Sequence, residues 1–172
     1  MPLKSSLAVQ SIEDKLGCGF WRRDVGADEM QWSRGLYRLL GHDPDTDKAS
    51  YTLLRQSQHP EDRLTFDVID RNVRAGTLFD REYRVLLPGG GTRRLAHKGE
   101  VIFGADGKPR FDVAVVWDVN DPNPQLDEIL ADERRTRVLL EALDLFIGLL
   151  WMEGEALVPS KVHTKQPIHR LF

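Results

Sequence analysis

The feature that most constrains the fold is a run of three strand patterns joined by short turns. Apolar and polar residues alternate in residues 78–87, 94–103 and 109–119, as they do in strands with one buried face. Three glycines at 89–91 fill the first turn, and the Asp-Gly pair at 106–107 is a tight hairpin signal in the second. Turns this short join antiparallel strands, so the pattern predicts a three-stranded antiparallel meander.

The residues before this meander predict a helix, two more strands and a further helix. Residues 7–16 carry apolar positions near helical spacing, which indicates an amphipathic N-terminal helix. Residues 20–25 and 30–33 are short strand candidates. Ser33 is expected to cap a short helix that ends at Gly41.

A longer helix is predicted over residues 59–75. Pro60 is tolerated in its first turn, and the two acidic residues that follow complement the helix dipole. Apolar positions along this helix, Phe66 and Ile69 among them, are expected to lie along a core. The order of helices and strands predicts an α+β domain with an antiparallel sheet.

The C-terminal part carries a separate helical pattern. Apolar positions recur at spacings of three and four from about residue 124 to 150, which predicts one helix of roughly 25 residues. The stripe consists of Leu126, Ile129, Thr136, Leu140, Leu143, Ile147 and Leu150. So wide an apolar side cannot be left in water, and a partner helix in a homodimer or a second domain is expected to cover it.

The chain therefore divides into four predicted parts. These are an N-terminal amphipathic helix (1–16), a central domain (17–121), an output helix (122–151) and an irregular tail (152–172) in which prolines break any longer element. An alternative for residues 138–172 is a truncated second domain, in which residues 147–151 form a strand.

Seven short motifs, taken in order, resemble a PAS domain of the kind common in bacterial multidomain sensors. They lie at residues 19–24 (GFWRRD), 30–33 (MQWS), 39–44 (LLGHDP), 59–63 (HPEDR), 79–84 (FDREYR), 106–107 (DG) and 118–120 (DVN). His42 stands where the family usually has an aromatic residue, and Asn120 stands where threonine is usual. The resemblance implies a five-stranded antiparallel sheet with helices on one face, a cavity between them, and a sensing or dimerising role without catalysis.

Composition argues against several classes of function. The chain has 24 Lys and Arg against 27 Asp and Glu, a balance unsuited to neutralising many phosphates, so no nucleic-acid partner is predicted. No nucleophile with its base, P-loop or dinucleotide fingerprint is recognisable, so no catalytic residue and no enzyme activity are predicted. The apolar run 138–151 is interrupted and too short for a bilayer span, so no membrane partner is predicted.

No cofactor or metal is predicted. The single cysteine, Cys18, precedes the first strand, and the reactive-cysteine helix that marks flavin photosensors of the family is missing. His59 is the nearest counterpart of a haem ligand, but its His-Pro pair is a common helix start in this subclass. A lone cysteine without a disulfide partner indicates a reducing, cytoplasmic setting.

Candidate ligand-pocket residues come from the helix at 59–75 and from the meander. They are Phe66, Ile69, Tyr83, His97, Val113, Val115 and Trp117. His97 shares a strand face with Leu95 and Val101, where an imidazole could orient a ligand. A histidine bonded to a backbone carbonyl, or one on the other face of the sheet, is the simpler explanation. Trp117 could likewise line a pocket or simply fill a core.

The sequence thus predicts a sensory or regulatory module. A small molecule or partner would bias its state, and the C-terminal helix, through Leu126, Ile129, Leu140, Leu143, Ile147 and Leu150, would carry that state to a homodimer partner and a downstream signalling protein. The alternative is a ligand-free PAS scaffold with a filled core that acts only in dimerisation or protein interaction.

Overall fold

The computed structural model describes residues 7–76 and 80–152 of the chain. The strands are β1 (Cys18–Asp24), β2 (Glu29–Trp32), β3 (Arg81–Leu86), β4 (Thr92–Phe103) and β5 (Pro109–Asp118). The helices are α1 (Leu7–Leu16), α2 (Arg34–Leu40), α3 (Tyr51–Ser57), the 3-10 turn η1 (Pro60–Asp62), α4 (Phe66–Arg74), α5 (Pro124–Leu130) and α6 (Glu133–Met152). None of these helices is both long enough and apolar enough to cross a membrane.

The strands form one five-stranded antiparallel sheet in the order β2-β1-β5-β4-β3. The predicted α+β class and the antiparallel meander β3-β4-β5 are confirmed. Because β5 lies in the middle of this order, the last strand of the meander also pairs with the first strand of the chain. Strand β5 therefore has a hydrogen-bonded neighbouring strand along each of its two edges, β1 and β4.

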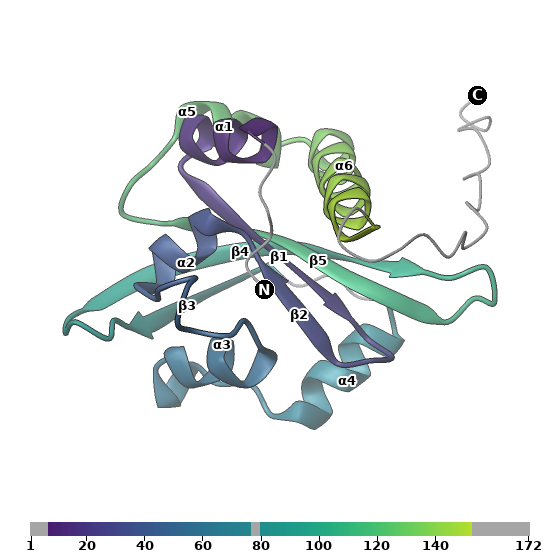
Figure 1. Cartoon of the computed structure of the whole chain (residues 1–172), viewed down its shortest axis with the longest axis horizontal. Helices are drawn as coiled ribbons and strands as arrows, with labels where there is room; N and C mark the ends of the chain where they lie inside the picture. The colour runs from purple at the N-terminus through teal and green to yellow at the C-terminus, as the bar shows by residue number, and fades with distance from the viewer. Residues whose placement is uncertain (1–6, 77–79, 153–172) are drawn as a thin grey trace.

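Helices cover both faces of the sheet (Figure 1). Helices α2, α3 and α4 lie on one side, which we call the inner face, and α1, α5 and α6 lie on the other, which we call the outer face. The inner core contains Trp21, Met30, Trp32, Leu36, Tyr37, Leu40, Ala49, Leu54, Tyr83, Val85, Leu95, Ala114 and Val116. The outer core contains Val9, Leu16, Cys18, Phe20, Val113, Val115, Leu126, Leu140 and Leu143.

Strand β1 and helix α2 approach each other closely at a glycine. A Cβ atom at Gly19 would lie 2.2 Å from the backbone nitrogen of Leu36, so only glycine fits there. The Ser33 hydroxyl accepts a hydrogen bond from the Leu36 amide, and Gly41 adopts a left-handed φ of 73° at the C-terminus of α2. The predicted start and end of this helix are both confirmed.

The helix predicted over residues 59–75 is wrong as a single element. The chain forms the short turn η1, passes through an extended Arg63, and begins α4 only at Phe66. The acidic start is held against β3 instead, because the Asp62 carboxylate accepts hydrogen bonds from the backbone and the guanidinium of Arg84. This attachment to the sheet competes with helix continuation.

The predicted long C-terminal helix is present as α6, but it is not continuous from about residue 124. It breaks into α5 and α6, because the Asp132 carboxylate caps the amides of Arg134 and Arg135 at the start of α6. The Thr136 hydroxyl, within hydrogen-bonding distance of the Ile129 and Asp132 carbonyls, holds the joint. The alternative strand at 147–151 is wrong too, since α6 runs to Met152.

Candidate functional site

Three rings form a row across the inner face of the sheet. The His97 ring lies 5.4 Å from the Tyr83 ring and 6.3 Å from the Trp21 ring, with edge-on geometry in both pairs. Strand β5 passes between β1 and β4 here, and its inner-face residue opposite Trp21 is only Ala114. The small residue leaves room for the larger rings to meet above it.

Two hydrogen-bonding groups of this row are buried with no hydrogen-bond partner among the described residues. They are the indole Nε1 of Trp21 and the phenol oxygen of Tyr83. Burial also raises the pKa of Tyr83, so its hydroxyl stays protonated and can donate a hydrogen bond. Buried polar atoms without partners are rare, and each one needs an explanation such as a bound molecule or water.

A buried ion pair lies on the same face beside this row. The Asp112 carboxylate accepts hydrogen bonds from Arg23 Nε at 3.1 Å and Nη2 at 2.9 Å. The Tyr51 ring of α3 lies 5.1 Å from the Arg23 guanidinium. Burial raises the pKa of Asp112 because desolvation of this deeply placed carboxyl outweighs the stabilising effect of its partner. The pair therefore places one positive and one negative side chain, bonded to each other, beside the row of rings.

The structure brings only some of the predicted pocket residues together. His97 of β4 and Tyr83 of the edge strand β3 are both buried on the inner face, with their rings 5.4 Å apart. Ile69 is buried on α4, but Phe66 is 56% exposed and packs on the ring of Tyr51.

Val113, Val115 and Trp117 point away from this site and belong to the outer core. Their alternation along β5 is correct, but β5 is buried on both faces, with Ala114 and Val116 on the inner one. A strand that is apolar on both sides gives no signal of which face meets the candidate site. The predicted set is therefore split between two faces of the sheet.

A second polar cluster, which the sequence did not reveal, surrounds His42. Its Nδ1 lies 2.9 Å from the Asp47 carboxylate and its Nε2 lies 3.0 Å from the Ser57 hydroxyl. The order acid, imidazole, hydroxyl resembles a nucleophile with its base, but the Ser57 hydroxyl donates to the Leu53 carbonyl at 2.8 Å. Ser57 is also buried at the negative end of α3, where a developing oxyanion is disfavoured. These contacts hold the loop that follows α2 against helix α3.

The outer face holds α5 and α6 against the sheet. Leu126, Leu140 and Leu143 of the predicted output stripe are buried in the outer core, and Ile129 packs partly against it. The side chains of Ile147 and Leu150 lie outside the described residues.

A charged contact adds to this packing. Asp144 of α6 accepts a hydrogen bond at 2.8 Å from Arg22 of β1, whose guanidinium stacks on Phe111 of β5. The partner that covers the described part of the stripe is thus the sheet of the same chain, in place of the partner helix or second domain that the sequence led us to expect.

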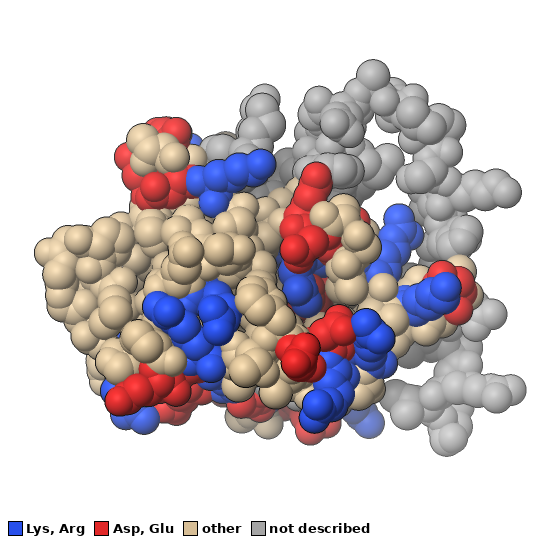
Figure 2. All heavy atoms as spheres, turned by 90° about the horizontal axis from the view of Figure 1, so that it is seen from below, with Lys and Arg blue, Asp and Glu red and all other residues tan. Residues whose placement is uncertain are grey.

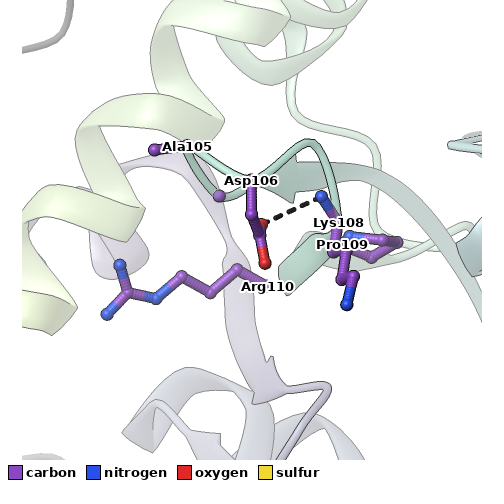
Figure 3. A pocket seen from close by; sticks show the side chains of 6 residues that line it. Ala105, Asp106, Lys108, Pro109 and Arg110 are labelled. Atoms are coloured by element: carbon purple, nitrogen blue, oxygen red, sulfur yellow. Dashed lines mark hydrogen bonds between the residues drawn. The ribbon is translucent and has the colours of Figure 1, made fainter.

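A depression of about 480 Å³ lies at the tip of the β4–β5 hairpin (Figure 3). It is lined by Gly104, Ala105, Asp106, Lys108, Pro109 and Arg110. The Asp106 carboxylate accepts a hydrogen bond from the Lys108 amide, which is ordinary turn geometry. All of the lining comes from one turn and its flanks, so this depression is a weaker candidate than the inner face.

Figure 2 shows acidic and basic side chains interspersed on the side that α3 and α4 occupy. Several are paired, such as Arg84 with Asp62 and Arg74 with Asp70. Among the described residues, no group of three or more histidine, cysteine or acidic side chains is placed to hold a metal ion.

Comparison with known proteins places this architecture in a family. The family model described as "PAS fold" matches residues 29–116, which is half of the chain. The chain belongs to the PAS fold family. No curated protein sequence matches it.

Solved structures agree with this assignment. A sensory box histidine kinase/response regulator from Burkholderia thailandensis matches with a TM-score of 0.54 and 22% identity, covering 74% of this chain and 96% of that one. The N-terminal domain of a diguanylate cyclase with PAS/PAC sensor from Marinobacter aquaeolei matches with a TM-score of 0.54 and 17% identity, covering 59% and 94%. An RNA-binding light-oxygen-voltage receptor matches with a TM-score of 0.54 and 18% identity, covering 74% and 35%. At these identities the likeness concerns the fold.

Proposed function

We propose that this chain is a sensory module that binds a small molecule on its inner face and passes its state to the helices of the outer face. The observation that carries the proposal is the pair of buried groups without partners, Trp21 Nε1 and Tyr83 Oη, on either side of His97. Both are hydrogen-bond donors, so the ligand is expected to present acceptor atoms such as carbonyl or ring nitrogen. The surrounding rings favour a flat molecule.

Cys18 does not fit the adduct chemistry of flavin photosensors. It lies in the outer core beneath α1, on the opposite side of the sheet from His97 and Tyr83. Burial also raises the pKa of its thiol to about 12, so the reactive thiolate is scarce. The proposed ligand is therefore one held by hydrogen bonds and stacking, and no particular cofactor is assigned.

Strand β5 is the proposed route between the two faces. Its inner-face residues Ala114 and Val116 contribute to the inner core, while Val113 and Val115 contribute to the core beneath α6. A shift of β5 on ligand binding changes both cores at once, because close-packed interiors transmit small displacements. Coupling of this kind commonly amounts to about 1–3 kcal/mol. The similar solved structures named for a histidine kinase and a diguanylate cyclase support a signalling protein as the downstream partner.

The ligand proposal is tested by native mass spectrometry and absorption spectroscopy of protein purified from its own host. We expect extra mass or colour in the wild type and an occupancy about fivefold lower in Tyr83→Phe, which loses one hydrogen bond. Tyr37→Phe is the matched control, since the Tyr37 hydroxyl is engaged with the Asp47 carbonyl. Equal occupancy in the wild type and Tyr83→Phe contradicts the proposed site.

The second candidate is a ligand-free dimerisation scaffold, and the outward side of α6 favours it. Val138 and Leu145 lie one heptad apart on this helix and are 63% and 54% exposed. We expect light scattering to show a homodimer that Val138→Glu dissociates. A monomer in the wild type contradicts this interface. A dimer without any bound mass favours the scaffold over the sensor.

A further inference from the structure

Helix α1 contributes one acidic side chain to the interior of the protein. Glu13 is only 2% exposed, although its neighbour Asp14 points to solvent. Both carboxylate oxygens of Glu13 lie 3.2 Å from the backbone nitrogen of Gly35, in the first turn of α2. A carboxylate this deeply buried is rare unless specific donors satisfy it.

Ser33 completes the set of donors. Its hydroxyl oxygen accepts hydrogen bonds from the amides of Phe20, at 2.8 Å, and Leu36, at 3.3 Å. A serine hydroxyl has two lone pairs and one hydrogen, so its hydrogen remains available to the Glu13 carboxylate, and the neighbouring hydroxyl acts to lower the pKa of that carboxylate. Glu13 of α1, the Phe20 amide of β1, and Ser33, Gly35 and Leu36 at the start of α2 therefore form one buried polar group, here called the Glu13 joint.

The Glu13 joint connects the two helical layers around the end of β1. Phe20 belongs to the outer core and Leu36 to the inner core. The joint leaves no room for a side chain at position 35, because a Cβ atom at Gly35 would lie 2.3 Å from the Cys18 carbonyl and 2.7 Å from Glu13 Oε1. Any displacement of the first turn of α2 thus moves donors that hold α1.

The charged and titratable groups around Glu13 come from three elements. Burial raises the pKa of Glu13, against the opposing effects of Ser33, Gly35 and the Arg38 guanidinium, and Asp14 adds to the rise. Cys18 of β1 is the remaining titratable neighbour, and the negative charge of Glu13 contributes to its raised thiol pKa. A raised pKa means that the docked state of α1 binds a proton more tightly than a released state does, so docking strengthens as the pH falls.

We propose that α1 is a second transmitting element, and that release of α1 from the outer face and displacement of the start of α2 occur as one linked event through the Glu13 joint. The described apolar anchors of α1 in the outer core are Val9 and Leu16, with Ile12 partly buried. Because this apolar contact is small, we expect the hydrogen bonds of the Glu13 joint to contribute a large share of the free energy that docks α1 on the outer face. This inference goes beyond the route through β5 and α6, and it does not require a ligand.

The single cysteine is a built-in reporter of this event. Cys18 is fully buried in the outer core together with Val9 and Leu16 of α1, so release of α1 is expected to expose it to a thiol reagent without unfolding of the whole domain. We expect Glu13→Ala to label at least about tenfold faster than the wild type, because Ser33 and Gly35 are left with unsatisfied donors. Asp14→Asn removes the neighbouring exposed charge and its ion pair with Arg38, and it is expected to label at the wild-type rate.

The Glu13→Gln variant distinguishes loss of the hydrogen bonds of the joint from loss of the negative charge alone. It removes the same negative charge near Cys18 as Glu13→Ala does but keeps an oxygen that accepts from Gly35 and Ser33, so its labelling is expected to stay close to wild type. The ratio of wild-type to Glu13→Gln rates should approach one as the pH falls, because the amide resembles the protonated acid. Equal acceleration in the alanine and glutamine variants overturns the proposal.

Linkage to α2 is tested by hydrogen exchange and by a double-mutant cycle. We expect Glu13→Ala to raise exchange in α1, at Phe20 and in the first turn of α2 together, and Glu13→Ala with Ser33→Ala to act non-additively. Labelling of Glu13→Ala should be insensitive to low urea, which distinguishes local release from global unfolding. Faster exchange in α1 alone, additive effects, or a urea dependence equal to that of global unfolding each overturns the proposal.

Discussion

Replacing Asp112 with alanine is expected to lower the free energy of unfolding by about 3 kcal/mol, because it leaves a buried guanidinium without its partner. Both side chains of the pair are largely buried, at 12% exposure for Arg23 and 10% for Asp112. Asp28 lies 3.8 Å from Arg23 but is itself exposed, so it compensates poorly. Urea denaturation followed by circular dichroism measures the change.

The matched control replaces both members of this pair. In Arg23→Met with Asp112→Leu no charge remains to be desolvated, and we expect a stability within about 1 kcal/mol of the wild type. If the double variant is as unstable as Asp112→Ala, packing at the site matters more than the unpaired charge. If Asp112→Ala matches the wild type, water reaches Arg23 and the inner face is more open than its burial indicates.

Leu140→Ala is expected to cost about 3 kcal/mol and to loosen α6 from the sheet, because it leaves a cavity in the outer core. Leu140 is fully buried there beside Leu126 and Leu143. Hydrogen exchange should rise in α6 and in the facing part of β5. This outcome tests the packing of the C-terminal helix on its own domain directly.

Val138→Ala is the control on the same helix, since Val138 is exposed. We expect it to change stability by less than about 0.5 kcal/mol. Asp144→Asn should have an intermediate effect, because it weakens the 2.8 Å contact with Arg22 but leaves the apolar packing intact. Comparable losses at Leu140 and Val138, measured where light scattering shows a monomer, contradict the placement of α6 in this structure.

Local features of the fold could be predicted from the sequence because neighbouring residues determine them. The meander follows from alternation between short turns, and the structure places the second turn at Gly107, with φ of 75°. Ser33 and Gly41 were recognisable as ends of α2 because capping depends on residues within one turn. His97 could be assigned to the same face as Leu95, since a strand has a period of two.

The errors in prediction have a common physical origin. The helix predicted at 59–75 is interrupted after Asp62, because Arg84, far along the chain, holds the Asp62 carboxylate against β3. The apolar stripe at Leu140 and Leu143 indicated burial, but periodicity does not identify the surface that buries it. In the structure that surface is the outer face of the sheet.

By itself the sequence determined the class of fold, the order of the strands along the chain and the residues that begin and end α2. Only the tertiary structure decided which face of β5 meets the inner site, what covers the apolar stripe of α6, and which groups satisfy the Glu13 carboxylate. Helical spacing places Glu13 on the same face of α1 as Val9 and Leu16, and it turns Asp14 away from that face. Their environments differ because β1 and α2, brought together at Gly19, supply donors to one of them. Side-chain function here depends on contacts between residues that are distant along the chain, and local pattern carries no information about those contacts.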